Sequence, residues 1–375
     1  MKDTKTVSRI TAYLHRNISK DVINALKDTG VQDLYLSPSR SLVIEVKKGI
    51  FSILPGNDLS QDATDTVFFL VNSDTADYLV SLIIEKGGLY FQGRGSVMAE
   101  EVQLMEGHKL CRENEINPFE KIVLPVTMHP CTGICCIARR GQGDHIARVS
   151  LDTGAGVPSI HFGIGTGVRN KMGLLRITIP AEKEIIHSFT TPYEADSIMD
   201  LMIEAGRLDQ PGSGFIYAYP VKKGLINMRV ARGEQRHAAS IEQIISALDH
   251  IKGNIDWRQR THGVDKRNGH RKRYISGLVD MILLCDDGTG TGLIKAAMSA
   301  GAGGANITFL RHIRPYDSPL NEISPARDLC SMVVPEETVE GVIKALEEAG
   351  VFTDRCHGQI YLRKILKAFT YIEKK

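Results

Sequence analysis

One local pattern occurs three times along this 375-residue chain: an amphipathic helix, a turn that contains glycine, and then a strand. The middle copy is the clearest, because apolar residues recur at helical spacing over 198–203 and the turn at 211–214 leads into the apolar run 215–221. The other copies run from 79–83 to 93–95 and from 339–346 to 357–358. A repeat constrains the fold more than a single motif does, because each copy has to form a structural unit of the same kind.

The segments around each copy extend the pattern to strand, helix, strand, strand, helix, strand. In the first third, alternation over 8–15 predicts a strand, Ser19 is the expected N-cap of a helix that ends at Gly30, and strands follow at 34–46 and 66–71. The remaining predictions are strands at 96–104, 133–138, 160–164, 185–189, 278–284, 305–310 and 329–334 and helices at 144–151 and 293–300. This order is that of the ferredoxin-like fold, in which two helices cover one face of four antiparallel strands.

The predicted fold class is therefore α+β, with three tandem ferredoxin-like (βαββαβ) domains. The predicted limits are 1–105, 131–231 and 275–375 for the domains and 106–130 and 232–274 for the linkers. The second linker contains an expected helix at 240–250 and a basic tail at 258–273, which we interpret as a flexible tether and not as a nucleic-acid site. The open face of each sheet needs cover, and three units in one chain can bury one another.

Composition narrows the classes of partner. A net charge of +2 with 24% charged residues gives no overall electrostatic reason to bind nucleic acid or an anionic membrane. No apolar run approaches the ~20 residues that span a bilayer. Seven cysteines without small-domain spacing or a leader peptide predict reduced thiols in a cytoplasmic protein.

The most specific motifs lie in the second unit, where Leu-Asp-Gln-Pro-Gly-Ser-Gly-Phe at 208–215 is followed by Ile-Tyr-Ala-Tyr-Pro-Val at 216–221. With the helix before them, these motifs resemble the PII nitrogen-regulatory signalling proteins, and the segment 293–306 is similar to the corresponding helix and turn of PII-like proteins. PII proteins are homotrimers that bind adenine nucleotides and a carboxylate metabolite in clefts between subunits. The resemblance implies a monomeric, intramolecular pseudo-trimer with up to three such clefts.

The resemblance also implies a set of ligand-binding residues. Glycines in the turn before each last strand match the family's phosphate-binding loop, where backbone N–H groups can approach an anion closely. The family's phosphate-binding lysine is replaced by Phe215, Ser96 and Gln359, so neighbouring cations would have to supply the charge. The implied ligand-binding residues are Gly93, Arg94, Gly95, Gly165, Gly167, Lys183, Gly212, Ser213, Gly214, Lys222, Lys223 and Gly358.

We expect a regulatory protein and not an enzyme, because no catalytic constellation stands out. The expected partners are a small-molecule effector, either an adenine nucleotide or a small carboxylate, and a protein target in nitrogen metabolism; no cofactor is assigned. Ligand ordering of a loop at 47–65, 168–183 or 313–327 would carry the signal. Two alternatives stay open: an interaction scaffold with vestigial pockets, and an amino-acid-binding regulatory protein with the same order of elements.

Three other groups of residues are expected to be structural. Strand alternation sends Cys135 and Cys136 to opposite faces, which argues against one metal ion shared by His129, Cys131, Cys135 and Cys136. The glycine string at 286–292 opens a helix, but its two aspartates would repel a phosphate, so a flexible helix start is expected. Cys356 and His357 are expected to be turn residues and not a nucleophile with its base.

Overall fold

The computed structural model describes residues 4–47, 56–105, 122–167, 182–227, 231–232, 248, 251–252, 272–314 and 324–372. It is a mixed α+β structure with one large, mainly antiparallel sheet. The predicted helix at 240–250, apart from residue 248, and the basic tail at 258–271 lie outside the described residues. So do 48–55, 168–181 and 315–323, which belong to the three candidate loops. The prediction of a loop at 47–65 is wrong in its second half, because residues 56–65 are part of strand β3 (Gly56–Val71), paired with β2.

The first strand group spans residues 4–105 and has the predicted order of elements. It contains β1 (Thr4–His15), α1 (Arg16–Asp28), β2 (Leu34–Lys47), β3 (Gly56–Val71), the 3-10 helix η1 (Ser73–Thr75), α2 (Ala76–Gly87) and β4 (Gly95–Met105).

The predicted start of α1 is wrong. The helix begins directly after β1, and its N-cap is His15, whose Nδ1 accepts a hydrogen bond from the N–H of Asn17 at 3.3 Å. Ser19 lies inside the helix, where its hydroxyl donates to the carboxylate of Asp65 on β3 at 2.6 Å. A polar side chain near the start of a helix often caps it, but here a carboxylate from a distant strand takes up the hydroxyl.

The second and third strand groups repeat the order. The second contains β5 (His129–Arg139), α3 (Gly143–Asp152), β6 (Ser159–Gly167), β7 (Glu182–Thr190), α4 (Ala195–Ala205) and β8 (Gly214–Leu225). The third contains β10 (Leu278–Asp286), α6 (Gly290–Ser299), β11 (Gly304–Ile313), β12 (Ala326–Pro335), the 3-10 helix η4 (Glu336–Thr338), α7 (Val339–Glu348) and β13 (Gln359–Lys364). Two short strands, β9 (Ala231–Arg232) and β14 (Lys367–Thr370), complete the sheet.

Strand order is the same in all three groups. It reads β4-β1-β3-β2 in the first group, β8-β5-β7-β6 in the second and β13-β10-β12-β11 in the third, with antiparallel neighbours throughout. The fourth strand of each group therefore lies beside the first, and the second strand lies at the opposite edge.

The outer strands join the three groups into one sheet. The second strands of the groups, β2, β6 and β11, pair with one another in all three combinations. At the other edges, β4 pairs with both β8 and β13, and β14 pairs with β8. Unpaired strand edges attract other chains, and this mutual pairing covers them.

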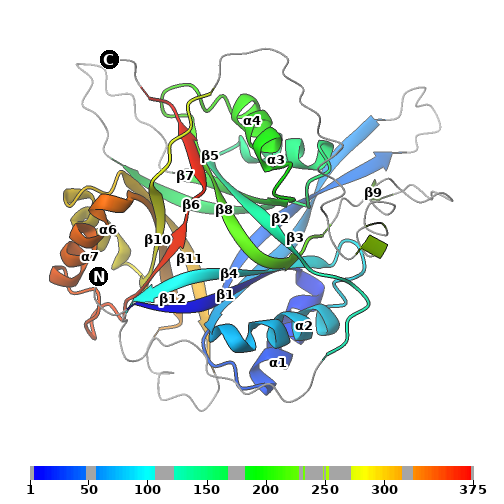
Figure 1. Ribbon diagram of the computed structural model, residues 1–375, viewed down its shortest axis with the longest axis horizontal. Coiled ribbons are helices and arrows are strands. Elements are labelled where there is room, and N and C mark those ends of the chain that lie inside the picture. Colours follow the sequence, from blue (N-terminus) through cyan, green and yellow to red (C-terminus); the bar gives the residue numbers. More distant parts are fainter. Residues whose placement is uncertain are drawn as a thin grey trace.

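Each group carries its helix pair on the outside, and Figure 1 shows the three pairs at the periphery of the strands. The alternation in β1 shows how one strand serves two faces: Ile10, Ala12 and Leu14 pack under α1 and α2, whereas Tyr13 packs in an inner cluster with residues of the other groups. Separate outer cores lie under α3 and α4 and under α6 and α7. The inner strand faces meet at the centre of the molecule in two further clusters.

No described helix is long and apolar enough to cross a bilayer.

Candidate functional site

The glycines that begin the last strands are required by close packing of the backbone. A Cβ on Gly95 would lie 2.2 Å from the carbonyl oxygen of Tyr13, and one on Gly214 would lie 2.2 Å from that of Ile137. At Gly358 the distance to a carbonyl oxygen would be 2.3 Å. Real Cβ atoms do not approach oxygen so closely, and packing therefore accounts for glycine at all three predicted ligand positions.

In the first glycine turn, the polar groups have partners within the chain. The N–H of Gly93 donates to the side chain of Asn227 at 3.0 Å, which links this turn to the segment after β8. Arg94 donates from Nε to the carbonyl of Gly87 at 2.6 Å, so its guanidinium is bound to the end of α2.

The second turn is held in the same manner. Arg139 donates to the carbonyls of Gly212 at 2.8 Å and Pro211 at 3.0 Å, and the N–H of Ser213 donates to the carbonyl of Gln210 at 3.2 Å. The turn thus presents carbonyl groups to an arginine of its own group.

The other predicted residues fall into two places. Gly165 and Gly167 lie on β6, opposite Asn306 and Gly304 of β11, and Lys183 lies on β7 opposite Gly163. Lys222 and Lys223 lie on β8, where they form exposed ion pairs with the first group, to Glu101 at 3.8 Å and Asp77 at 2.9 Å. The twelve predicted residues therefore do not converge on one pocket.

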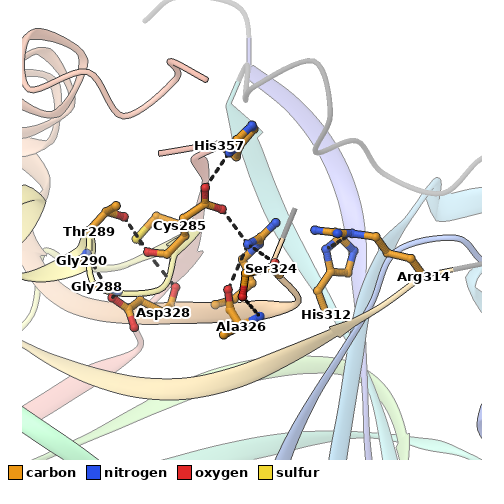
Figure 2. Close-up of polar contacts among 12 residues, drawn as sticks. Cys285, Gly288, Thr289, Gly290, His312, Arg314, Ser324, Ala326, Asp328 and His357 are labelled. Carbon is orange, nitrogen blue, oxygen red and sulfur yellow. Dashed lines mark hydrogen bonds and ion pairs between the residues drawn. The ribbon is translucent and has the colours of Figure 1, made fainter. Parts of the chain in front are cut away.

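Each group has a carboxylate that the sequence analysis missed, on its third strand and beside the start of its first helix. In the third group, Asp328 accepts hydrogen bonds from the N–H groups of Gly288 at 3.0 Å and Gly290 at 3.1 Å (Figure 2). The amides that a phosphate would need at the glycine string are thus bound to the protein's own anion. Burial raises the pKa of Asp328, and the two N–H groups oppose that shift.

The same position holds Glu184 in the second group and Asp65 in the first. Glu184 accepts from the N–H groups of Gly141 at 2.8 Å and Gly143 at 2.6 Å, and Asp65 binds the Ser19 hydroxyl. The three carboxylates occupy corresponding register positions, opposite Leu14, Ala138 and Cys285 of the first strands. The repeat therefore extends to a specific polar contact.

Asp286 lies next to this contact in the third group. Its carboxylate binds Arg327 Nη1 at 2.6 Å and His357 Nδ1 at 2.6 Å, as Figure 2 shows for the histidine. His357 has a backbone φ of 44°, as expected for a turn residue, and burial raises the pKa of the neighbouring Cys356 thiol. A raised thiol pKa opposes formation of the nucleophilic thiolate.

A histidine–carboxylate contact joins the third group to the first. His312 Nε2 lies 2.7 Å from Asp33 Oδ1, and its Nδ1 accepts from Arg314 Nε at 3.0 Å. The imidazole stacks on Tyr35 at 4.6 Å between ring centres, across the β11–β2 pairing. Burial lowers the pKa of His312, while Asp33 acts in the opposite direction.

The junction between the first and second groups has spare hydrogen-bond donors. Arg40 on β2 donates from Nη2 to Asp144 at 2.7 Å and to Glu184 at 2.9 Å. Its Nε and Nη1 are buried and have no hydrogen-bond partner among the described residues. The guanidinium lies 5.1 Å from the ring centre of Phe162, a side chain that is 57% exposed, and Arg140 approaches the same ring at 5.9 Å.

The hairpin of β2 and β3 continues beyond this junction and packs on the second group (Figure 1). Leu42 and Ile44 are buried in the core under α3 and α4, and Gln61 on β3 donates to Asp144 at 2.7 Å. The first group thus places two strands against the start of α3.

The cysteine predictions can be compared with the packing. Cys136 lies in the outer core under α3 and α4, whereas Cys131 and Cys135 lie in an inner cluster, so the predicted separation to opposite faces is confirmed. Burial raises the pKa of Cys135 to about 12. Within the described ranges, no three His, Cys, Asp or Glu side chains converge in a way that could hold a metal ion.

All three groups meet at Arg363 on β13. It donates to Glu100 on β4 at 2.8 Å, to Asp280 on β10 at 2.5 Å and to the hydroxyl oxygen of Tyr217 on β8 at 3.2 Å. Its guanidinium also lies 3.7 Å from the ring centre of Tyr219. Burial alone would lower the pKa of Arg363, but the two carboxylates hold it well above its ordinary value.

Beside Arg363 lies a cavity of about 70 Å³, lined by residues from the inner strands of all three groups. Two histidines line it, and burial lowers the pKa of His161 to about 4 and that of His187 well below its ordinary value. Both imidazoles are therefore neutral at neutral pH.

Comparison with models of known protein families finds no match, and comparison with curated proteins finds no significant match. Function therefore has to follow from the residues and contacts of the chain itself.

Proposed function

We propose that this chain is a regulatory protein of PII-like architecture, in which three tandem ferredoxin-like units form an intramolecular pseudo-trimer and respond to a small metabolite. The common strand order of the three groups and the mutual pairing of their outer strands support this architecture. A fold alone does not specify a function, and the effector site has to be argued from particular side chains.

The observation that carries the proposal is the pair of unused donors on Arg40. A buried guanidinium nitrogen without a partner is costly, because burial removes the water that would otherwise bind it. Arg40 leaves two such nitrogens, Nε and Nη1, at the junction of the first and second groups. An acidic group of a ligand at this junction could accept a hydrogen bond from one of them.

The surroundings of Arg40 define the class of effector. Guanidinium groups bind carboxylates and phosphates in a two-pronged geometry, and this favours an anion over a neutral ligand. The exposed ring of Phe162 offers an aromatic face on which a flat group could stack. Arg140, which is ion-paired with Glu182 at 2.7 Å, lies beside the same ring. An adenine nucleotide or a small carboxylate fits this chemistry.

The same junction supplies a route for the signal. Asp144 accepts from both Arg40 and Gln61, so it holds the β2–β3 hairpin against the start of α3. An anion that binds Arg40 competes with Asp144 for the guanidinium. The hairpin is either bound to the start of α3 or released from it, and the anion shifts this equilibrium by its difference in affinity for the two states. A protein partner that contacts the hairpin would then read the effector.

Calorimetry and thermal unfolding of the full chain with adenine nucleotides, cyclic nucleotides, 2-oxoglutarate and amino acids test the proposal. A ligand present at 100 times its dissociation constant should stabilise the fold by about 2.7 kcal/mol. Binding should also change amide hydrogen exchange in β2 and β3, because the hairpin contacts are altered.

The matched variants are Arg40→Gln and Arg148→Gln. Arg148 forms an exposed ion pair with Asp152 on α3 of the second group, so its loss removes the same charge from the other side of the junction without touching the Arg40 contacts. We expect binding to be lost in Arg40→Gln and kept in Arg148→Gln. Equal binding in both variants would contradict the assignment of the junction.

The scaffold alternative has its own support. The glycine-turn amide of Gly93 and the helix-start amides of Gly288 and Gly290 are already bound to other groups of the chain. If the folded wild-type protein binds none of the ligands tested, the scaffold alternative is favoured. If it binds an amino acid alone, the amino-acid-sensing alternative is favoured.

A further inference from the structure

The central cavity can hold one small molecule. Its volume is about 70 Å³, and a cavity needs roughly 10–15 Å³ to hold a single water. Sites for drug-sized ligands and cofactors measure about 300–1,000 Å³. The cavity therefore has room for a few waters or one ligand of a few heavy atoms, and none for a nucleotide.

The lining is rich in hydrogen-bond donors. Among the described residues that line the cavity, Asp280 is the one carboxylate, and it already accepts from Tyr217 at 2.9 Å, from Ser331 at 2.8 Å and twice from Arg363. Further hydroxyl and amide groups come from Ser37, Thr66, Thr308 and Asn306. A ligand that mainly accepts hydrogen bonds suits such a lining.

Arg9 on β1 is the donor without a full set of partners. It lines the cavity, is 9% exposed, and its Nε has no hydrogen-bond partner. Its nearest carboxylate oxygen, on Glu100, lies 3.6 Å from Nη1 and is shared with Arg363 at 2.8 Å. His187, which also lines the cavity, has a buried Nδ1 without a partner. Buried polar atoms of this kind normally have a protein or solvent partner.

The charges around the cavity limit the ligand to a single charge. Among the described residues of this network, Arg9 and Arg363 balance Glu100 and Asp280. A multiply charged anion would leave a large uncompensated charge in a buried site, and its desolvation would be costly. Among anions, a monovalent one adds the least charge to this balanced network.

We propose that the central cavity binds one small, planar, monovalent oxyanion of the formate, acetate or nitrate class, with Arg9 as its main hydrogen-bond donor. This site is separate from the Arg40 junction and does not depend on the function proposed there. It lies where strands of all three groups converge, so an occupied cavity would stabilise the closed arrangement of the groups.

Titration of the full chain with sodium formate, sodium acetate and sodium nitrate, each balanced with sodium chloride to constant ionic strength, tests the proposal. Calorimetry should give saturable binding of one anion per chain, and the melting temperature should rise with the same concentration dependence. Arg9→Gln should weaken binding by at least about tenfold, because hydrogen bonds to charged groups contribute the most. Arg148→Gln, which removes an exposed charge outside both proposed sites, should leave the affinity unchanged.

A second variant guards against a folding defect in Arg9→Gln. Thr308→Val keeps the shape of a side chain that lines the cavity and removes its hydroxyl, and we expect it to weaken the same anion several-fold. The proposal is overturned if none of the three anions binds the folded wild-type chain, which would leave a cavity that holds water alone. Binding that is lost in Arg148→Gln, or unchanged in both cavity variants, overturns it equally.

Discussion

Replacement of Arg363 by methionine would remove a buried side chain that contacts all three strand groups. Arg363 is 3% exposed and binds Glu100 of the first group, Tyr217 of the second and Asp280 of the third. Methionine fills a similar volume and has no charge. The substitution therefore isolates the ionic contacts from the packing.

The size of the effect follows from the burial of the two carboxylates. Glu100 and Asp280 are 1% and 0% exposed, so bulk solvent reaches neither carboxylate when its cation is removed. Loss of one partner of a buried ion pair typically costs 3–5 kcal/mol, because the other charge stays buried and uncompensated. Arg9 remains near Glu100, and Ser331 remains bound to Asp280, so we expect a loss of about 4 kcal/mol and not twice that amount.

Equilibrium unfolding in urea measures the loss directly. Arg148→Met is the control, because its exposed ion pair with Asp152 should contribute below about 1 kcal/mol. The triple variant Arg363→Met, Glu100→Gln, Asp280→Asn also removes the two carboxylate charges that the single variant leaves uncompensated, and it should recover part of the stability. A loss under about 1 kcal/mol in Arg363→Met, or a triple variant less stable than the single one, would refute the reasoning.

Two further predictions concern a strand glycine and a buried histidine. Gly214→Ala should destabilise the fold by about 1–3 kcal/mol, because its Cβ would lie 2.2 Å from the carbonyl oxygen of Ile137. Gly341→Ala, which lies in open space on α7, should stabilise the fold by about 0.5–1 kcal/mol. Similar urea midpoints for the two variants would contradict this prediction. The folded pKa of His161 is lowered from 6.5 to about 4, so the unfolded chain binds the extra proton first and stability should fall by about 3 kcal/mol as the pH drops from 6.5 to 4. His161→Gln should flatten that part of the stability profile, and an unchanged slope would show that His161 does not cause it.

The order of the secondary-structure elements could be predicted because it is written in local periodicity. Alternation in β1 and the helical spacing in α4 depend on neighbours within a few residues, and the predicted strands and helices in the described ranges are present. The largest shift is in β3, which begins at Gly56 and not at 66. The error at Ser19 has a non-local cause, since Asp65 lies 46 residues further along the chain.

The functional contacts were harder to predict, because they join residues that no motif links. Arg40 meets Asp144 and Glu184 over separations of 104 and 144 residues. A signal did exist for the central network: Asp280 interrupts the apolar run 278–285, and a charge in such a run needs a buried partner. Nothing in the sequence says which partner that is.

The sequence by itself determined the repeat, the elements of each copy and the glycine positions, because these follow from short-range periodicity and from backbone conformation. Only the tertiary structure decided how the outer strands of the groups pair and where Arg9, Arg363 and the two histidines converge. Pairing of strand edges and compensation of buried charge depend on which surfaces meet in space, and local sequence patterns carry no information about that meeting.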